Sequence, residues 1–423
     1  MGSLLCHTPK IGVAQNMCNR KYAPNTDGFL VHAPLRIEDF FNTAALQMFL
    51  SAHRSDSMVE EREEKKKNRS HKLYVVVALG SVFTVVGVFS FLYAYPLLWQ
   101  RDFVDNSGIP KSDLKIAIIT DANFSDKGWG ESSLNAVRYI EQKYNFSIAS
   151  EDNVAIPDIE MTLKKYAQSG YNLIIAHGFQ WGEPALQVGQ AYPQTKIVVF
   201  TGLVESRNVA SIFPQQQEGS FLLGALAGMM TKTNVIGFVG GEEYPNVVNI
   251  FEGYKQGAEW VNHNITVVGT YLNDWDNPAR GREAATSIIR QGADFMFHVA
   301  DSSGQGVIQA SDENGIYALG AVQDQNHLAP DTVLSSFVLD VDKAYDGVVR
   351  MVTEGNFRAE IFRPGIELQR GSDGQGVVYL APFHALESKV PEIVQEQLTK
   401  LTNEILQQKI KVPERLEPEP LHT

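Results

Sequence analysis

Residues 114–143 read LKIAIITDANFSDKGWGESSLNAVRYIEQK and set the pattern for most of the chain. The Ile-rich run 114–120 is typical of a buried strand, the polar stretch that follows is typical of a loop, and 131–143 of a helix. Further strands of this first set are expected at 145–152, 172–178, 196–202 and 208–213, with helices at about 158–170 and 184–193.

A long apolar helix at 217–231 opens a second set of the same kind. Its strands are expected at 234–241, 265–272, 294–300 and 317–322, separated by helices at about 247–262, 278–291 and 304–313. Alternating strands and helices predict parallel sheets covered by helices. The sequence therefore predicts an α/β fold of two Rossmann-like lobes, preceded by one transmembrane helix.

The expected two-lobed domain covers residues 112–385. Lobe 1 takes about 112–215 and 336–360 and lobe 2 about 216–335, because the strand 333–340 and the helix 341–354 are expected to cross back to lobe 1. Residues 386–423 are expected to form an amphipathic helix and a frayed tail. Ligands of open parallel sheets bind at the carboxyl ends of the strands, so the two lobes predict a cleft between them.

Residues 73–95 form an apolar run of 23 residues without a charge. A helix of this length spans the roughly 30 Å hydrocarbon core, and we expect a membrane anchor over 73–99. Lys65, Lys66 and Lys67 precede it, so the positive-inside rule places residues 1–72 in the cytoplasm and the large domain outside the membrane. A cleaved signal peptide is the alternative, but the run is longer than a typical signal-peptide core.

The cytoplasmic segment 1–72 is expected to be mostly disordered, with a short amphipathic helix at 37–53. Two alternatives stay open: translation can start at Met58, and Met1-Gly2-Ser3 hints at myristoylation although Cys6 stands where Ser or Thr is wanted. Cys6 and Cys18 are the only cysteines, so the large domain has no disulfide, Cys-ligated metal or thiol nucleophile.

Charge is unevenly distributed along the chain. The formal net charge is −13, with +4 in residues 1–101 and −17 in the remainder. A domain this acidic lacks the basic face that nucleic acids require, so no nucleic-acid partner is expected.

The expected cleft loops are rich in aromatic, carboxylate and amide side chains, which suits a flat polar ring stacked between aromatic faces. The alternative is that the aromatic side chains only cover the lobe surfaces. The residues predicted to bind the ligand are Asp126, Lys127, Trp129, Phe179, Trp181, Asp274, Trp275, Asp301, Gly304, Asp324 and Gln325.

Catalytic motifs are missing from the sequence. It has no P-loop, no H-E-x-x-H and no G-x-S-x-G elbow beside His177. The carboxylates Asp126, Asp274 and Asp301 could serve as an acid/base pair or a metal site, but hydrogen bonding to a ligand is the favoured role. We therefore expect a binding protein without a cofactor, not an enzyme.

Several stretches resemble the basic membrane protein family of ABC-transporter substrate-binding proteins, in family order over about 114–385. They are SDKGWGESSLNAV, NVASIFPQQQEGSFLLGALAGMMTKTNVIGFVGG, GYKQGAE, GADFMFHVADSSGQGVIQA and ALGAVQDQNHLAPDTVLSSFVLDVDKAYDGVV. The details IIAHGFQWGE, YLNDWDN and QDQNHLAPDTVLSS are closest to the Med-like branch, often described as transporter-like or as competence regulators.

The resemblance implies a type I periplasmic-binding-protein fold and, in transport members, nucleosides whose purine lies between two aromatic residues. These match Trp129 and Trp275. The family also holds the ribose with an Asp in G-V-D-x-D-Q and a Lys in T-S-x-x-K, and here Val322 and Leu339 stand at those positions while Asp324 and Gln325 remain. Because these polar groups are lost, a free base or a differently substituted purine is expected over a nucleoside.

The function expected from these features is capture of a small purine-type ligand at the outer face of the cell membrane by a single-pass protein. Lobe closure around the ligand would then deliver it to an ABC permease and ATPase. The alternative is a Med-like membrane-bound sensor or regulator without a transport role.

Overall fold

The computed structural model describes Pro110 and residues 113–366 and 376–417. The expected cytoplasmic segment 1–72 and membrane anchor 73–99 lie outside these residues. Along the residues that are described, no helix is both long and apolar enough to cross a membrane.

Lobe 1 is built on a six-stranded sheet in the order β11-β5-β4-β3-β1-β2, in which every described pairing is parallel. Its strands are β1 (Ile116–Thr120), β2 (Ala149–Glu151), β3 (Leu173–His177), β4 (Lys196–Phe200), β5 (Val209–Ile212) and β11 (Ile361–Phe362). Side chains of β1 alternate between two cores: Ile116 and Ile118 join one cluster and Ala117 and Ile119 the other. The strand is therefore buried on both faces, which explains its uninterrupted apolar sequence.

Lobe 2 repeats this plan with the order β12-β10-β9-β8-β6-β7, where only the β10–β12 pair is antiparallel. Its strands are β6 (Val235–Gly240), β7 (Thr266–Tyr271), β8 (Phe295–Val299), β9 (Tyr317–Val322), β10 (Val333–Leu339) and β12 (Val378–Leu380). The two expected sets of strands are thus present, each in a sheet of its own.

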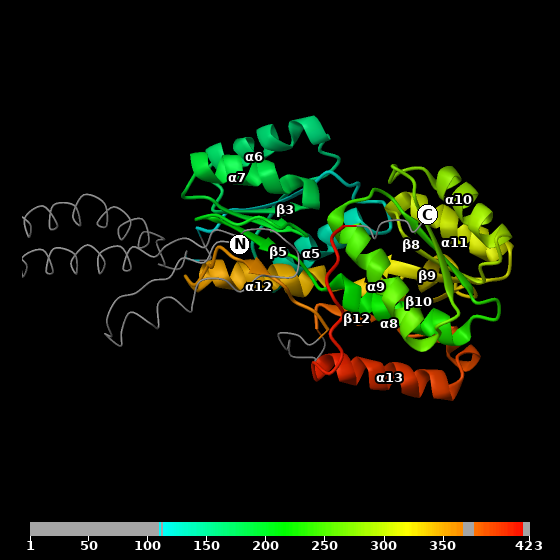
Figure 1. Cartoon of the computed structure of the whole chain (residues 1–423). Coiled ribbons are helices and arrows are strands. Elements are labelled where there is room, and N and C mark those ends of the chain that lie inside the picture. The colour runs from blue at the N-terminus through cyan, green and yellow to red at the C-terminus, as the bar shows by residue number, and fades with distance from the viewer. Residues whose placement is uncertain (1–109, 111–112, 367–375, 418–423) are drawn as a thin grey trace, which may run out of the picture. The chain divides into compact units, whose positions relative to one another are not determined.

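Helices cover both faces of each sheet (Figure 1). In lobe 1, α5 (Trp129–Tyr144) packs with α12 (Val341–Thr353), and α6 (Ile159–Gln168) packs with α7 (Gly182–Ala191). The helices of lobe 2 are α8 (Gln216–Met230) with α9 (Pro245–Val261), α10 (Pro278–Arg290) with α11 (Asp301–Glu313), and α13 (Glu392–Leu406), which packs along α8. Helix α8 is apolar on nearly all sides because it lies between the sheet, α9 and α13.

The return crossing between the lobes differs from the expected boundary at residue 336. Strand β10 belongs to lobe 2 in full, because it pairs with β9 on one side and with β12 on the other. The chain leaves lobe 2 at Asp340, whose side chain accepts a hydrogen bond from the backbone N–H of Lys343 and so caps α12. Helix α12 then packs on lobe 1 as expected, and β12 brings the chain back to lobe 2.

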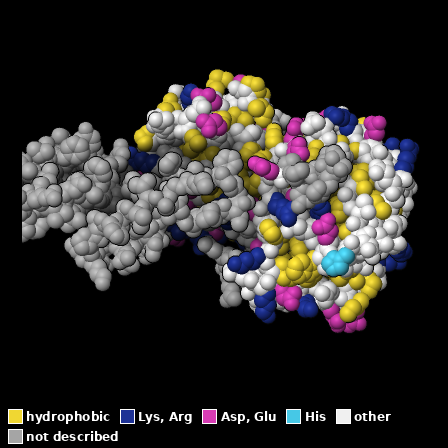
Figure 2. Space-filling view, viewed as in Figure 1, with side chains coloured by type: hydrophobic (Ala, Val, Ile, Leu, Met, Phe, Trp, Pro, Cys, Tyr) yellow, Lys and Arg dark blue, Asp and Glu magenta, His cyan; other side chains and the backbone are white. Residues whose placement is uncertain are grey.

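On the face of the described lobes in Figure 2, acidic and basic side chains are interspersed. Lys and Arg side chains do not gather into one large patch on this visible face.

Candidate ligand-binding site

A cavity of about 310 Å³ lies between the lobes at the carboxyl ends of the strands, and residues of both lobes line it. Five of the predicted ligand residues line this cavity: Asp126, Trp129, Phe179, Trp275 and Asp301. Its volume is at the lower end of the range for small-molecule sites. The fold thus brings loops from distant parts of the sequence to one site, as parallel lobes predict.

Asp126 organises the start of α5. Its carboxylate accepts hydrogen bonds from the backbone N–H groups of Gly128 (2.8 Å), Gly130 (2.6 Å) and Glu131 (3.1 Å). These are N–H groups that the first turn of a helix leaves without partners. A Cβ on Gly130 would lie 2.1 Å from the carbonyl oxygen of Asn123, so the turn accepts only glycine there. Asp126 therefore fixes the position of the next ring, Trp129.

Trp129 stacks on His177, with ring centroids 3.8 Å apart and an angle of 26° between the planes. His177 Nε2 lies 3.1 Å from the carbonyl oxygen of Trp129, which can only accept, so Nε2 carries the hydrogen. Nδ1 is then the acceptor for the hydroxyl of Tyr345. Burial lowers the pKa of His177 from 6.5 to about 3, so the ring is neutral and acts as a support for Trp129.

Trp275 enters the cavity from lobe 2. Its ring lies against Gly241, where an added Cβ would be 2.2 Å from the indole. The centroid of Tyr244 lies 6.1 Å from Trp275 and 6.1 Å from Phe179, which belongs to lobe 1. Aromatic side chains of the two lobes therefore meet around one cavity, as a stacked ring ligand requires.

Carboxylates dominate the charge of the cavity. Burial, followed by the neighbouring Asp126 carboxylate, raises the pKa of Asp301 well above its usual range. Burial likewise raises the pKa of Asp121 and of Asp126, although both accept hydrogen bonds. Burial therefore favours the protonated, neutral form of these carboxyl groups, and the shifts mark a poorly solvated site that holds several of them.

Two amide oxygens in the cavity lack hydrogen-bond donors among the described residues. They are Oε1 of Gln216, whose side chain is 1% exposed, and Oδ1 of Asn246. A buried oxygen without a donor is costly, and a ligand N–H at this place would satisfy it. The sequence analysis missed both residues, although they follow the expected strands 208–213 and 234–241, because it chose loops by their aromatic and carboxylate side chains. A polar residue opening an otherwise apolar helix was the available signal at Gln216.

The other six predicted ligand residues do not line this cavity. Lys127 pairs with Glu131, and Asp274 pairs with Arg280. The indole of Trp181 is fully buried and its Nε1 donates to Asp121 Oδ1 at 3.0 Å. The remaining three are Gly304, which lies against the ring of His298, Asp324, which contacts His384, and Gln325, which is buried between strands and loops.

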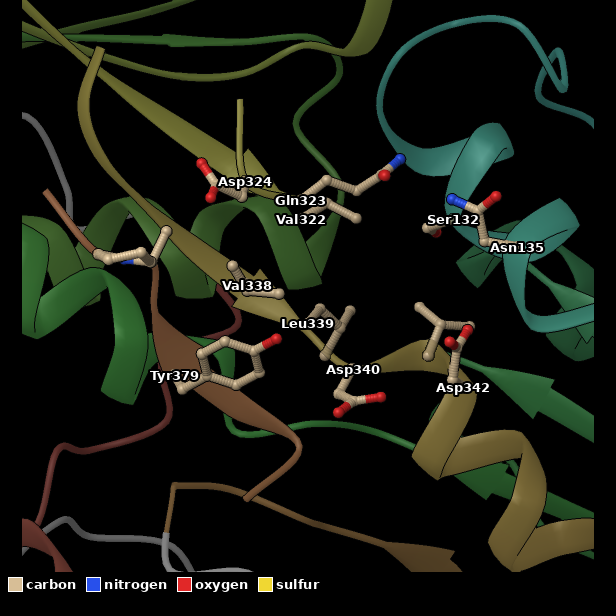
Figure 3. A pocket seen from close by; sticks show the side chains of 13 residues that line it. Ser132, Asn135, Val322, Gln323, Asp324, Val338, Leu339, Asp340, Asp342 and Tyr379 are labelled. Carbon is tan, nitrogen blue, oxygen red and sulfur yellow. The ribbon is translucent and has the colours of Figure 1, made fainter. Parts of the chain in front are cut away.

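A second cavity, of about 340 Å³, lies at the ends of β9, β10 and β12 and against α5 (Figure 3). Val322 and Leu339 face this space, with the hydroxyl of Tyr379 directed toward it and Asn135 on the opposite side. Val322 also lines the first cavity, so the two spaces adjoin at this residue. The two positions matched to the ribose-binding residues of the resembled family are therefore apolar and lie together.

Three glutamines of lobe 2 donate to three consecutive backbone carbonyls of lobe 1. Nε2 of Gln305 reaches the oxygen of residue 126 at 3.2 Å, Nε2 of Gln325 that of residue 127 at 3.2 Å, and Nε2 of Gln323 that of residue 128 at 2.7 Å. These bonds hold the Trp129 loop against lobe 2. Gln305 and Gln323 were not among the predicted ligand residues, because their role concerns the lobes and not a ligand.

Comparisons with solved structures and with characterised proteins identify the family of this chain. A solved ABC transporter solute-binding protein of Aeropyrum pernix K1 superposes with a TM-score of 0.62 at 22% identity, over 71% of this chain and 94% of that one. A purine-binding protein of Brucella abortus is 27% identical over 67% of this chain and 79% of its own length. The transcriptional activator protein med of Bacillus subtilis is 28% identical over 57% of this chain and 75% of its own length.

Two parallel-sheet lobes around a shared cavity define a ligand-binding protein with the periplasmic-binding-protein fold. Residues 113–415 match the Bmp family, described as ABC transporter substrate-binding protein PnrA-like, and the chain belongs to this family. It is a solute-binding protein of the ABC-transporter type, and the resemblance inferred from the sequence is confirmed.

Proposed function

We propose that this protein captures a purine base in the interlobe cavity and delivers it to an ABC permease. The observation that carries the proposal is one cavity with Trp129 from lobe 1, Trp275 from lobe 2, and hydrogen-bond acceptors around them. Aromatic faces bind the ring by stacking, and carboxylate and amide oxygens accept from its N–H groups. The purine-binding relative of Brucella abortus supports the ligand class.

A base is favoured over a nucleoside because of Val322 and Leu339. Both line the second cavity, beside the first, and neither can donate or accept a hydrogen bond. Ribose hydroxyls that lie against these two side chains would lose hydrogen bonds to water without replacement from them, although polar residues such as Asn135 and Asp340 line other parts of the same cavity. The two apolar side chains instead suit a hydrogen atom or a small apolar substituent on the base.

Thermal unfolding of the full-length chain against bases, nucleosides and unrelated small molecules tests this function. A ligand that binds only the folded state stabilises it by about 2.7 kcal/mol when it is present at 100 times its Kd. We expect purine bases to raise the melting temperature and guanosine and inosine to do so much less. Equal increases in melting temperature with bases and nucleosides would contradict the preference for a base. No increase with any purine would contradict the proposal that the ligand is a purine.

We also propose that the binding domain lies outside the cell membrane, tethered by residues 73–99. The proposal rests on the uncharged apolar run 73–95 and the basic cluster before it. The two cysteines at positions 6 and 18 allow a direct test. A membrane-impermeant maleimide should label them only after cells are permeabilised, whereas a Cys introduced at the exposed Lys232 should react in intact cells. Labelling of Cys6 and Cys18 in intact cells would contradict this topology.

A membrane-bound regulator is the second candidate function. The similarity to the transcriptional activator med of Bacillus subtilis favours it, together with the segment 1–72 before the apolar run. In that case ligand binding outside the membrane would act through the anchor. Deleting residues 2–57 should then abolish a transcriptional response while leaving ligand uptake unchanged, and loss of uptake alone in a cavity variant would favour transport.

A further inference from the structure

The interlobe cavity has an unusual charge balance. Five carboxylates line it and, among the residues that the structure describes, no Lys, Arg or His does so. The five are Asp121, Asp126, Glu242, Asp276 and Asp301, which come from both lobes. Hydrogen-bond donors of the protein compensate Asp126 and Asp121 in part, but no cationic side chain of the described lining does so, and an anionic ligand would be repelled.

Four of the five carboxylates, all except Glu242, affect one another electrostatically. Burial is the main reason why the pKa values of Asp121 and Asp301 are raised; Asp126 adds to the rise at Asp301, and Asp276 adds a smaller rise at both. Like charges in poorly solvated positions destabilise each other, and a cation between them removes that repulsion. The cavity is therefore electrostatically complementary to a positive charge.

The aromatic lining has the same preference. Four rings line the cavity: Trp129, Phe179, Tyr244 and Trp275. The face of an aromatic ring is negative, and Trp is the side chain that attracts a cation most strongly. Rings and carboxylates together form the type of cage that binds cationic groups in other proteins.

An independent observation comes from the unpaired amide oxygens. Gln216 is 1% exposed, lines the cavity, and its Oε1 has no donor among the described residues; Oδ1 of Asn246 is in the same situation. Neither oxygen can be satisfied by a ligand that offers only acceptors. A ligand with several N–H groups would satisfy both.

We propose that the ligand of this cavity is a flat heterocyclic cation, such as a purine that carries a positive charge through N-alkylation. This inference rests on the proposed function and narrows it, because it names the charge of the ring that the two tryptophans bind. Phosphorylated purines are excluded by the same charges.

Matched pairs of rings that differ mainly in charge test the inference. The first pair is the 7,9-dimethylguanine cation and neutral 9-methylguanine, and the second is the 1-methylnicotinamide cation and neutral nicotinamide. Calorimetric titration of the full-length chain measures each Kd. We expect each cation to bind at least about tenfold more tightly than its neutral partner, since several carboxylates and two indoles act on the same charge.

Carboxylate variants give a control within the chain. Glu242 lines the cavity, whereas its neighbour Glu243 is exposed and does not. Glu242→Gln should reduce the preference for the cation several-fold, and Glu243→Gln should leave it nearly unchanged. Asp301→Asn should have the largest effect, and because Asn can still accept the N–H of Trp129, the fold should persist.

The outcomes separate this inference from the proposed function. Equal binding of 9-methylguanine and its cationic partner would overturn the inference and leave purine capture intact. If the 1-methylnicotinamide cation binds and neither purine does, the preference for a cation is supported and the proposal that the ligand is a purine is overturned. Binding of none of the four rings would overturn both.

Discussion

Val322 has a backbone conformation that is rare for its residue type. Its φ is 69°, in the left-handed region that β-branched residues avoid. Such strain costs on the order of 1–3 kcal/mol and persists where the surroundings impose it. Here it is imposed at the end of β9, at the point where the two cavities adjoin. An Asp tolerates this conformation better than Val, so the position can accept the polar residue that the family resemblance places there.

The double variant Val322→Asp with Leu339→Lys should therefore gain nucleoside binding. Each hydrogen bond to a charged group contributes about 1.5–3 kcal/mol, so guanosine affinity should rise by roughly ten- to a hundredfold for each contact made. Calorimetric titration with guanosine and guanine measures the change. As a control, Val338→Asp adds a carboxylate to the second cavity alone. A gain with the control, or none with the double variant, would show that these two positions do not select against ribose.

His298 makes the folded state sensitive to acid. Burial lowers its pKa from 6.5 to about 4, so the unfolded chain takes up a proton first as the pH falls. The free energy of unfolding is therefore highest, as far as His298 is concerned, above pH 6.5, and it decreases as the pH falls from 6.5 toward 4. His298→Gln should therefore reduce the difference in unfolding free energy between pH 7 and pH 5 by about 2 kcal/mol. Urea unfolding at both pH values measures it, and an unchanged difference would mean that His298 is not neutral and buried.

At the scale of elements, the start of α5 links the fold to the site. Asp126→Ala removes the acceptor for three backbone N–H groups, so it should cost about 2 kcal/mol of stability or more. It should also weaken ligand binding, because the Trp129 ring would lose its fixed position. Urea unfolding and titration measure both effects. Asp274→Ala, which removes a partly exposed pair with Arg280 and one hydrogen bond from the backbone N–H of Asp276, is the control and should cost less stability than Asp126→Ala.

Most strands and helices could be predicted from the sequence because each is local. Apolar runs of about six residues and helical periodicity place β3, β4, β8 and β9 within two residues of their observed ends. The sheet to which β10 belongs could not be predicted, because it depends on pairing with β12, more than 35 residues later in the chain. Local patterns do not contain that information.

The site was predicted in part for a similar reason. Trp129, Trp275 and Asp301 follow the carboxyl ends of strands, and in parallel sheets these ends all lie at the same edge, which here faces the interlobe cavity. The burial of Trp181 and the pairing of Asp274 with Arg280 depend on neighbouring elements. A prediction from residue type and loop position alone therefore placed both residues at the cavity, which neither lines. Gln216 and Asn246 stand at helix starts, as Trp129 and Asp301 do, but an isolated amide side chain in the sequence does not show that its oxygen will be buried without a donor.

At the scale of the whole molecule, the three glutamine bridges connect lobe 2 to the loop that carries Trp129. A protein whose two lobes close over a ligand gains affinity from contacts that form only in the closed state. Gln305 and Gln323 bridge the two lobes through side-chain amides, at 3.2 and 2.7 Å. They stabilise the arrangement of the lobes in which both tryptophans line one cavity.

The double variant Gln305→Ala with Gln323→Ala should therefore bind its ligand up to about thirtyfold more weakly, because closure would lose two hydrogen bonds of about 1 kcal/mol each. Its radius of gyration without ligand, measured by small-angle X-ray scattering, should equal or exceed that of the wild type. Gln309→Ala serves as the control, since Gln309 lies on the same helix and contacts Glu313. An unchanged ligand affinity in the double variant would show that the glutamine hydrogen bonds do not contribute to lobe closure.

The central claim is that a purine ring binds between Trp129 and Trp275. Calorimetric titration of the full-length chain with its best purine ligand, repeated for Trp129→Leu, Trp275→Leu and Trp260→Leu, tests it most directly. Trp260 is 56% exposed and lies outside the cavity, so it is the matched control. The account predicts one site per chain, a loss of at least about tenfold in affinity for each of the first two variants, and little change for the third. Purine binding of wild-type strength in Trp129→Leu and Trp275→Leu would contradict it.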